Sequence, residues 1–364
     1  MQTQKFKKRF IMRTIYILLF SVVFTFLFTQ CETGRTTTQG MSVTGKVGEI
    51  LVVCDQAIWD SPIQETLDSQ LVRYILPYLP DVPTFNLTHR TPKHFTEGVK
   101  RFRNTLFLKI DPNYTGEYGK IEKRNDVWAK GQLVIDVIGK DYNQLIETCR
   151  KGLGKVHDEF DDASWRRLMN NFKRNKGTST NKAIQNNFGI DIVLPSRSKL
   201  VTKRPNFYRV EFPDASRPIE FVGVSEDVGA IFSGVMIYQY EYKDSSQFEF
   251  KELLMARDTM LRYNAPSEVE GMYMGTQYNE IVYPEGNPIS SIYKVQGYEM
   301  RGMFVFTGRQ KFGTGGAFWA FHFVHPKRNK LICISGYVDA PATTTWTHAI
   351  REVEAVLRSV KLVE

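Results

Sequence analysis

Cysteine and histidine are scarce in this sequence of 364 residues, which holds four cysteines and six histidines. No Cys-x-x-Cys pair occurs, and this excludes a zinc knuckle and a thioredoxin-type redox site. The histidines are dispersed, and His322 and His325, three residues apart on an expected strand, would face opposite ways. We therefore expect neither a metal site nor a cofactor.

The sequence also lacks the common signatures of hydrolases and nucleotide-binding enzymes. It contains no Gly-x-Ser-x-Gly, no His-Glu-x-x-His and no P-loop. Two Ser-x-x-Lys matches, at 196–199 and 291–294, have the spacing found in penicillin-binding proteins. That chemistry needs the serine at the start of a helix, whereas both matches lie in strand-like or turn sequence. We interpret them as chance matches and predict no catalytic residue.

A leader of three zones opens the chain. Five basic residues come first, an apolar run of about 14 residues from Ile15 to Phe28 follows, and a short polar junction ends at Cys31. A spanning helix needs about 20 apolar residues, so a run of this length is more typical of a signal peptide. We expect residues 1–30 to be removed.

Cys31 is the expected site of lipidation. In a lipoprotein signal the cysteine at the cut takes a diacylglycerol on its thiol, and two or more acyl chains give a stable anchor. The junction Phe28-Thr29-Gln30 departs from the usual small-residue pattern, so an uncleaved anchor and a plain secretory signal remain as alternatives. Residues 31–46 are polar and rich in threonine and glycine, which predicts a flexible tether. We expect the protein to be held in the cell envelope, on the outer membrane and facing the periplasm.

The other three cysteines, Cys54, Cys149 and Cys333, each lie among apolar neighbours. An exported chain can pair two of them, which leaves at least one unpaired. We interpret all three as small buried hydrophobic residues.

The charge balance does not favour a nucleic-acid partner. The whole chain has a net charge of +9, but its leader holds five basic residues and no acidic one. Without these five, the 48 basic residues fall to 43, against 39 acidic residues. So small a surplus in a chain of this length gives no reason to expect nucleic acid.

The length predicts two domains after the tether, at residues 47–178 and 179–364. In the first, the segments "GEILVVCD", "PTFNLTH", "NTLFLKI" and "GQLVIDVIG" are typical of strands, and a long helix is expected to begin at Asp141. The acidic run at 158–162 and the basic run at 166–176 suggest a metal loop and a phosphate-binding face. We interpret them instead as the two ends of one helix, an order that the helix dipole favours.

The second domain consists of successive strand patterns with one central helix and one closing helix at 345–360. Such an order favours an antiparallel sheet covered by helices. We therefore predict an α+β protein with two domains, each a mainly antiparallel sheet covered by helices.

Several segments carry a resemblance to a known family. They include "GKVGEILVVCD", "FGIDIVLPSRSKLV", "RDTMLRYNAPSEVEGMYMGT", "GTGGAFWAF" and "KLICISGYVDAP". Together with the leader, they resemble an uncharacterised lipoprotein family of Bacteroidetes-type bacteria, known only as a domain of unknown function and covering nearly the whole mature chain. The resemblance implies export and anchoring, and no catalytic residues. The second half is also similar in layout to PsbP-like domains, which implies a role in binding or assembly.

A glycine-rich segment is the candidate ligand-binding site. It combines permissive backbone, positive charge and aromatic surface within a dozen residues: Arg309, Lys311, Gly313, Gly315, Gly316, Phe318 and Trp319. The alternative is a plain glycine hairpin between two core strands.

These patterns favour a lipid-anchored binding or scaffolding module over an enzyme. The expected partners are the membrane, through Cys31, and an anionic envelope component or an envelope protein. The alternative is an envelope hydrolase acting on glycan or peptidoglycan, because an aromatic content of 13% is compatible with sugar stacking. A deep cleft with two carboxylates about 5 to 10 Å apart would favour hydrolysis.

Overall fold

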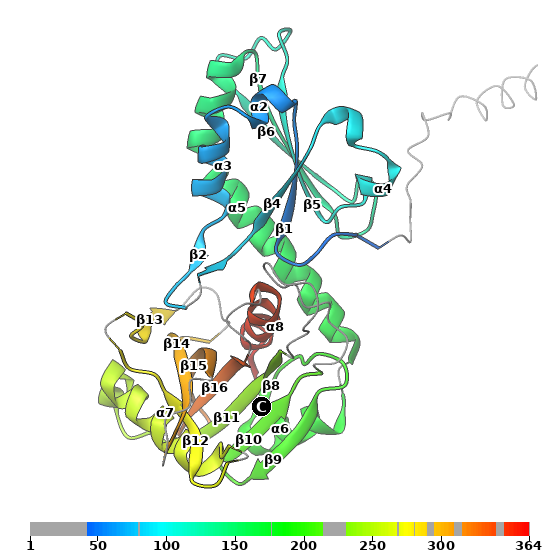
Figure 1. Cartoon of the computed structure of the whole chain (residues 1–364). Coiled ribbons are helices and arrows are strands. Elements are labelled where there is room, and N and C mark those ends of the chain that lie inside the picture. The colour runs from blue at the N-terminus through cyan, green and yellow to red at the C-terminus, as the bar shows by residue number, and fades with distance from the viewer. Residues whose placement is uncertain are drawn as a thin grey trace, which may run out of the picture.

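We describe the fold from a computed structural model of the chain (Figure 1). It describes residues 42–78, 81–175, 177–213, 231–267, 269–279, 281–289, 295–308, 315–339 and 346–363. The leader and Cys31 lie outside these residues, so lipidation stays a prediction. Within these ranges, the chain forms no helix that is both long and apolar enough to cross a membrane.

The first domain is built on a sheet with the strand order β4-β1-β5-β7-β6. The strands are β1 (Glu49–Val53), β4 (Asn86–Arg90), β5 (Asn104–Ile110), β6 (Lys120–Asn125) and β7 (Leu133–Gly139). Neighbours pair in parallel except β6 and β7, so the prediction of a mainly antiparallel sheet is wrong for this domain. The segments after β1 and β4 contain helices, and a helical crossover lets the next strand run in the same direction.

The helices α3 and α5 cover one face of this sheet. The helical elements of the domain are α2 (Gln56–Trp59), α3 (Ile63–Leu71), η1 (Pro92–His94), α4 (Glu97–Lys100) and α5 (Tyr142–Phe172). Apolar side chains of α3 and α5 share one core with β1, β5 and β7. As predicted, Asp141 caps α5, and its carboxylate accepts the backbone N–H of Gln144 at 2.8 Å. The acidic run and most of the basic run lie within this helix, which confirms the single-helix interpretation.

A short ribbon extends from the first domain toward the second. It consists of β2 (Tyr74–Ile75) and β3 (Val82–Pro83), which pair in antiparallel fashion. Figure 1 shows it between the two domains, close to β13.

The second domain is built on an antiparallel sheet with the order β12-β14-β15-β16-β11-β10-β9, and β13 also pairs with β14. This confirms the predicted antiparallel arrangement for the second half. The expected strand at 219–224 lies outside the described residues. The strands are β9 (Lys199–Arg204), β10 (Phe207–Glu211), β11 (Phe232–Glu241), β12 (Met272–Thr276), β13 (Glu285–Ile289), β14 (Gly297–Gly308), β15 (Gly315–His325) and β16 (Lys330–Asp339).

Helices pack on both faces of this sheet. The remaining elements are η2 (Lys173–Asn175), α6 (Ser179–Phe188), β8 (Ile190–Asp191), η3 (Ser245–Phe248), α7 (Phe250–Asn264), α8 (Thr347–Arg358) and β17 (Lys361–Leu362). The helix α7 packs on one face, and α6 and α8 pack on the other. Nearly every residue of α8 is buried, including charged ones, because the first domain covers the side that the sheet leaves free.

One hydrophobic core spans both domains. It contains Trp165, Leu168 and Phe172 from the end of α5, two residues of the ribbon, Ile75 and Val82, and the α8 face of the second sheet. Figure 1 shows α5 running from the first domain down to the second, with α8 beneath the first domain. The two domains are therefore packed against each other through α5, α8 and the ribbon.

Candidate functional site at the junction of the two domains

Arg351 of α8 connects the two domains. Its guanidinium donates to the Asp161 carboxylate on α5 at 2.6 Å and to the Thr84 carbonyl at 2.8 Å. The guanidinium also lies 4.6 Å from the centre of the Phe85 ring, so it makes a cation–π contact with a residue of the first domain. A buried arginine is tolerated here because one carboxylate, one carbonyl and an aromatic face replace much of the water that its guanidinium loses.

A second cluster of charges lies further along α8, where it faces β14. Glu354 accepts from Arg358 at 3.0 Å and lies 3.8 Å from Arg301 of β14, whose other partner is Glu299. Burial raises the pKa of Glu354 to about 7, although the two arginines act to lower it. Burial alone would lower the pKa of Arg301, but Glu299 and Glu354 together raise it above its usual value.

The strands β13 and β14 place four polar side chains side by side at this junction. Glu285 lies opposite Arg301 in the strand register, and Asn287 lies opposite Glu299. Residues two apart on a strand point to the same face, so the four side chains form one square on the face toward the first domain. They line a pocket of about 200 Å³ together with Leu76, which follows β2 in the ribbon.

The Glu299 carboxylate gives this interdomain pocket a buried hydrogen-bond acceptor that receives no donor from the described residues. Its residue is 7% exposed, and its Oε1 atom pairs with the Arg301 guanidinium. Its Oε2 atom is buried and has no hydrogen-bond partner among the residues that the structure describes. A buried carboxylate oxygen without a donor is costly, which makes the atom a candidate contact for a ligand.

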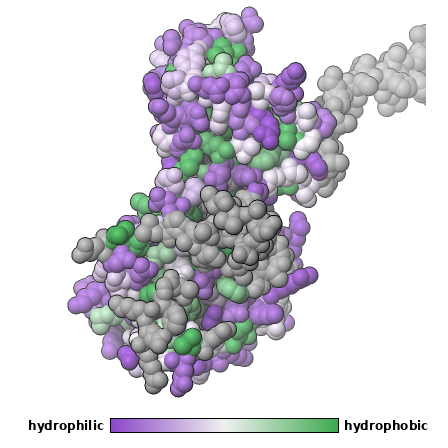
Figure 2. Space-filling view, viewed as in Figure 1, coloured by the Kyte–Doolittle hydropathy of each residue, from purple (hydrophilic) through white to green (hydrophobic). Residues whose placement is uncertain are grey.

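An apolar side chain is exposed on the pocket wall. Leu76 is 59% exposed, whereas the exposed Tyr283, before β13, packs against Phe250 of α7 on the other face of the sheet. Figure 2 shows hydrophobic surface at the left margin of the narrow waist, where β2 and β13 lie in Figure 1. Ligand sites commonly combine such apolar surface with a few convergent polar groups.

The glycine-rich segment predicted from the sequence lies only partly within the described residues. Arg309, Lys311 and Gly313 fall outside them, while Gly315 and Gly316 begin β15. A Cβ on Gly316 would lie 1.9 Å from the Val338 carbonyl oxygen, so close strand packing accounts for this glycine.

The two aromatic residues of that segment are both buried at 1% exposure, on opposite faces of the sheet. Phe318 packs in the core beneath α7, and Trp319 packs in the core shared with the first domain. The Arg301 guanidinium lies 3.9 Å from the Trp319 ring centre and covers it. Any ligand at this segment would therefore use groups other than these two rings, and its binding role stays a prediction.

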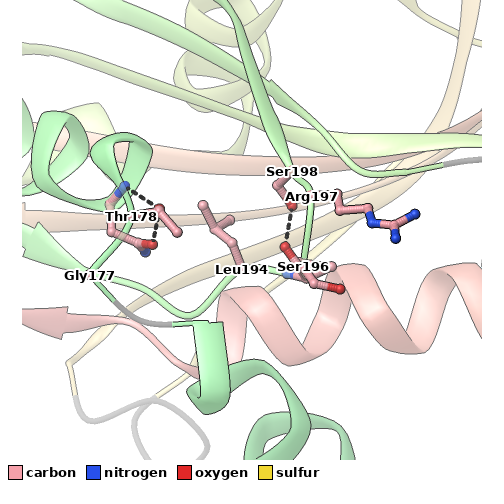
Figure 3. A pocket seen from close by; sticks show the side chains of 8 residues that line it. Gly177, Thr178, Leu194, Ser196, Arg197 and Ser198 are labelled. Atoms are coloured by element: carbon pink, nitrogen blue, oxygen red, sulfur yellow. Dashed lines mark hydrogen bonds between the residues drawn. The ribbon is translucent and has the colours of Figure 1, made fainter.

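A cavity of about 340 Å³ lies where α6 begins (Figure 3). It is lined by Thr178, which caps α6, and by the loop 194–198. Ser198 donates to the Pro195 carbonyl at 2.7 Å, and Arg197 points away from Thr178 in Figure 3. Ser196 lies in this loop and not at a helix start, which confirms that its Ser-x-x-Lys match lacks the catalytic context; the match at 291–294 lies outside the described residues.

Another cavity, of about 370 Å³, lies between α7 and β12. Its carboxylate, Asp258, accepts from the Tyr278 hydroxyl at 2.6 Å and from the Thr276 backbone N–H at 3.2 Å. Within the described part of the chain, no buried side-chain atom lining either cavity lacks a partner. The interdomain pocket differs from both in this respect.

Three thiols and the two histidines of β15 are placed inside the protein. Cys54, Cys149 and Cys333 are free and buried, as predicted, and burial raises the pKa of each thiol to about 12. His322 and His325 are also buried, and burial lowers the pKa of His322 to about 3. In the described ranges, no three His, Cys, Asp or Glu side chains are grouped to hold a metal ion.

Sequence reasoning did not identify the interdomain pocket. The signal that exists is the alternation of Glu299 and Arg301 in a strand that is otherwise largely apolar. Alternate polar residues on a central strand indicate that something polar covers that face. The sequence gives no indication, however, that the first domain and β13 bring Leu76, Glu285 and Asn287 to the same place.

Two solved structures are among those that this chain resembles in part. A crystal structure of the Saccharomyces cerevisiae Ran-binding protein Mog1p is 13% identical over 48% of this chain and 91% of its own, with a TM-score of 0.30. The solution structure of the PsbP protein CyanoP from the cyanobacterium Synechocystis is 10% identical over 45% of this chain and 92% of its own, with a TM-score of 0.23. No curated protein matches the sequence.

Two family models match the chain, where the sequence suggested a single family. Residues 43–173 match a Domain of unknown function (DUF8532), and residues 177–359 match a second one. That second model covers half of the chain, and the protein therefore belongs to the family described as Domain of unknown function (DUF4837).

Proposed function

We propose that this protein is a lipid-anchored component of the bacterial cell envelope that binds a partner protein and does not catalyse a reaction. The anchoring half of the proposal rests on the order of charge, apolar run and Cys31 in the leader. Mass spectrometry of the membrane fraction tests it. The expected mature chain begins at a lipidated Cys31, whereas an unmodified chain that retains residues 1–30 would contradict the proposal.

One observation carries the binding half of the proposal. The interdomain pocket joins a buried oxygen of Glu299, without a partner among the described residues, to exposed apolar surface at Leu76. Charged groups near it are engaged in ion pairs, one between the domains, Arg351 with Asp161, and one within α8, Arg358 with Glu354. A pre-formed surface with one unsatisfied acceptor suits recognition of a complementary group.

Site-specific photo-crosslinking in living cells tests this binding. A photoreactive residue at position 76 is expected to capture a protein partner, because Leu76 is exposed on the pocket wall. Met255 on α7 is similarly exposed, and it serves as the matched control position. Equal yields of adduct from both positions would contradict binding at the junction.

The alternative function is an envelope hydrolase acting on glycan or peptidoglycan. In its favour, the pocket holds two carboxylates, Glu285 and Glu299. Against it, the Oε1 atom of Glu299 is held by the Arg301 guanidinium, so this atom is not free to approach a substrate bond. Release of soluble fragments from purified peptidoglycan by the wild type, and not by a Glu299→Gln variant, would establish the hydrolase.

A further inference from the structure

We propose that the interdomain pocket recognises the primary ammonium group of a lysine side chain on the partner protein. This inference rests on the proposed binding function and adds the chemistry of the group that is bound. The pocket wall carries two carboxylates, Glu285 and Glu299, and one guanidinium, Arg301, so its charge favours a cation. Glu354, which lies 3.8 Å from Arg301, pairs with Arg358 on the same helix.

The hydrogen-bonding capacity of the wall fits an ammonium group. An ammonium has three donors and no acceptor. The wall offers Glu299 Oε2, which is buried and without a partner in the described chain, and beside it the exposed carboxylate of Glu285 and the side-chain amide of Asn287. The strand register places Asn287 directly opposite Glu299, so both can approach one bound nitrogen from neighbouring strands.

The size and surroundings of the pocket fit a lysine side chain in particular. A volume of about 200 Å³ holds roughly six water-sized groups, enough for four methylenes and an ammonium. Leu76, on the wall, supplies apolar surface for the methylenes. Leu76 is 59% exposed, so it also gives the backbone of a partner apolar surface to lie on, which a free amine would not use.

Saturation-transfer difference NMR with the intact protein tests the proposal. The probe is Nα-acetyl-lysine methylamide, for which a Kd of about 1 mM is expected from one side chain. Nα-acetyl-norleucine methylamide has a similar chain without the ammonium, and it is expected to give no saturation. Equal saturation of the two compounds would overturn the proposal.

Variants and a second amine locate the interaction. Glu299→Gln keeps the shape of the side chain and is expected to weaken binding of the lysine probe about 10- to 100-fold, as loss of a charge-assisted hydrogen bond does. Glu252→Gln, on exposed α7 at the opposite face of the sheet, is expected to bind as the wild type does. Wild-type affinity in Glu299→Gln would overturn the assignment of the site.

A replacement variant and a second amine complete the test. If Glu299→Gln does not fold, Glu285→Gln replaces it, because that exposed carboxylate has no ion pair among the described residues to lose. n-Butylamine carries the same ammonium without peptide groups, and binding as tight as that of the lysine probe would overturn the assignment to a protein side chain. Crosslinking from position 76 without any binding of the lysine probe would leave the proposed function standing and refute only this inference.

Discussion

Replacing Arg351 by methionine is expected to destabilise the protein by about 3 kcal/mol. The change removes the guanidinium that pairs with Asp161 at 2.6 Å and donates to the Thr84 carbonyl at 2.8 Å, while methionine keeps much of the apolar volume. Breaking a buried ion pair by deleting one partner costs about 3 to 5 kcal/mol. The lower end applies here, since the Asp161 side chain is 24% exposed and retains its bond from Trp165 Nε1.

Denaturant unfolding of the wild type and of Arg351→Met measures this loss, and a double-mutant cycle with Asp161→Asn isolates the pair. We expect a coupling energy of about 0.5 to 3 kcal/mol, the range for residues in one ionic network. Lys100→Met is the control, because its ion pair with Glu97 is a surface pair within one turn and should contribute less than about 0.5 kcal/mol. An Arg351→Met protein within 1 kcal/mol of the wild type would refute the account of the junction.

Three other changes have defined outcomes. Burial raises the pKa of Glu354 from 4.5 to about 7, so the folded protein holds an extra proton between these pH values. The free energy of unfolding therefore falls by about 3 kcal/mol as pH rises from 4.5 to 7, and Glu354→Gln should remove this fall when stability is measured by urea unfolding. Gly336→Ala, where a Cβ would lie 1.9 Å from a side-chain atom of α8, should cost about 1 to 3 kcal/mol, whereas Gly98→Ala has open space and should be near neutral by the same assay. Arg309→Ala with Lys311→Ala should weaken capture of an anionic envelope partner and leave Tm within a few degrees, and unchanged capture would make this segment structural.

Most strands of the second domain were predictable because their patterns are long and bounded by turns, whereas the short β13 was missed. The segments containing β14, β15 and β16 were recognised directly, since each strand is at least 10 residues long and largely apolar. The closing helix was also predictable from its apolar spacing. Its burial on all sides was not, because that depends on the first domain and not on the helix itself.

The direction of the first sheet was predictable in principle and was assigned wrongly. Its strands β1 and β7 are buried along almost their whole length and read as continuous apolar runs, which is typical of parallel strands. Helices between the strands favour the same arrangement. The edge strand β6, with the sequence "KIEKRN", was missed because charged residues on an edge hide the apolar alternation.

The candidate site depends on contacts that the sequence does not encode locally. Leu76 and Glu299 are far apart along the chain, and they meet because the ribbon of one domain reaches a strand of the other. Conversely, the glycine-rich segment combined glycine, charge and aromatic residues in a short stretch, yet its Phe318 and Trp319 fill two separate cores. Proximity in sequence along a strand does not place side chains on one face.

Crosslinking from position 76 in cells that carry Glu299→Gln tests the central claim most directly, namely that the interdomain pocket binds a protein partner through this carboxylate. The wild-type background is expected to give a defined protein adduct, and the Glu299→Gln background is expected to lose most of it while the protein stays folded and at the membrane. An adduct of equal yield in both backgrounds would contradict the claim.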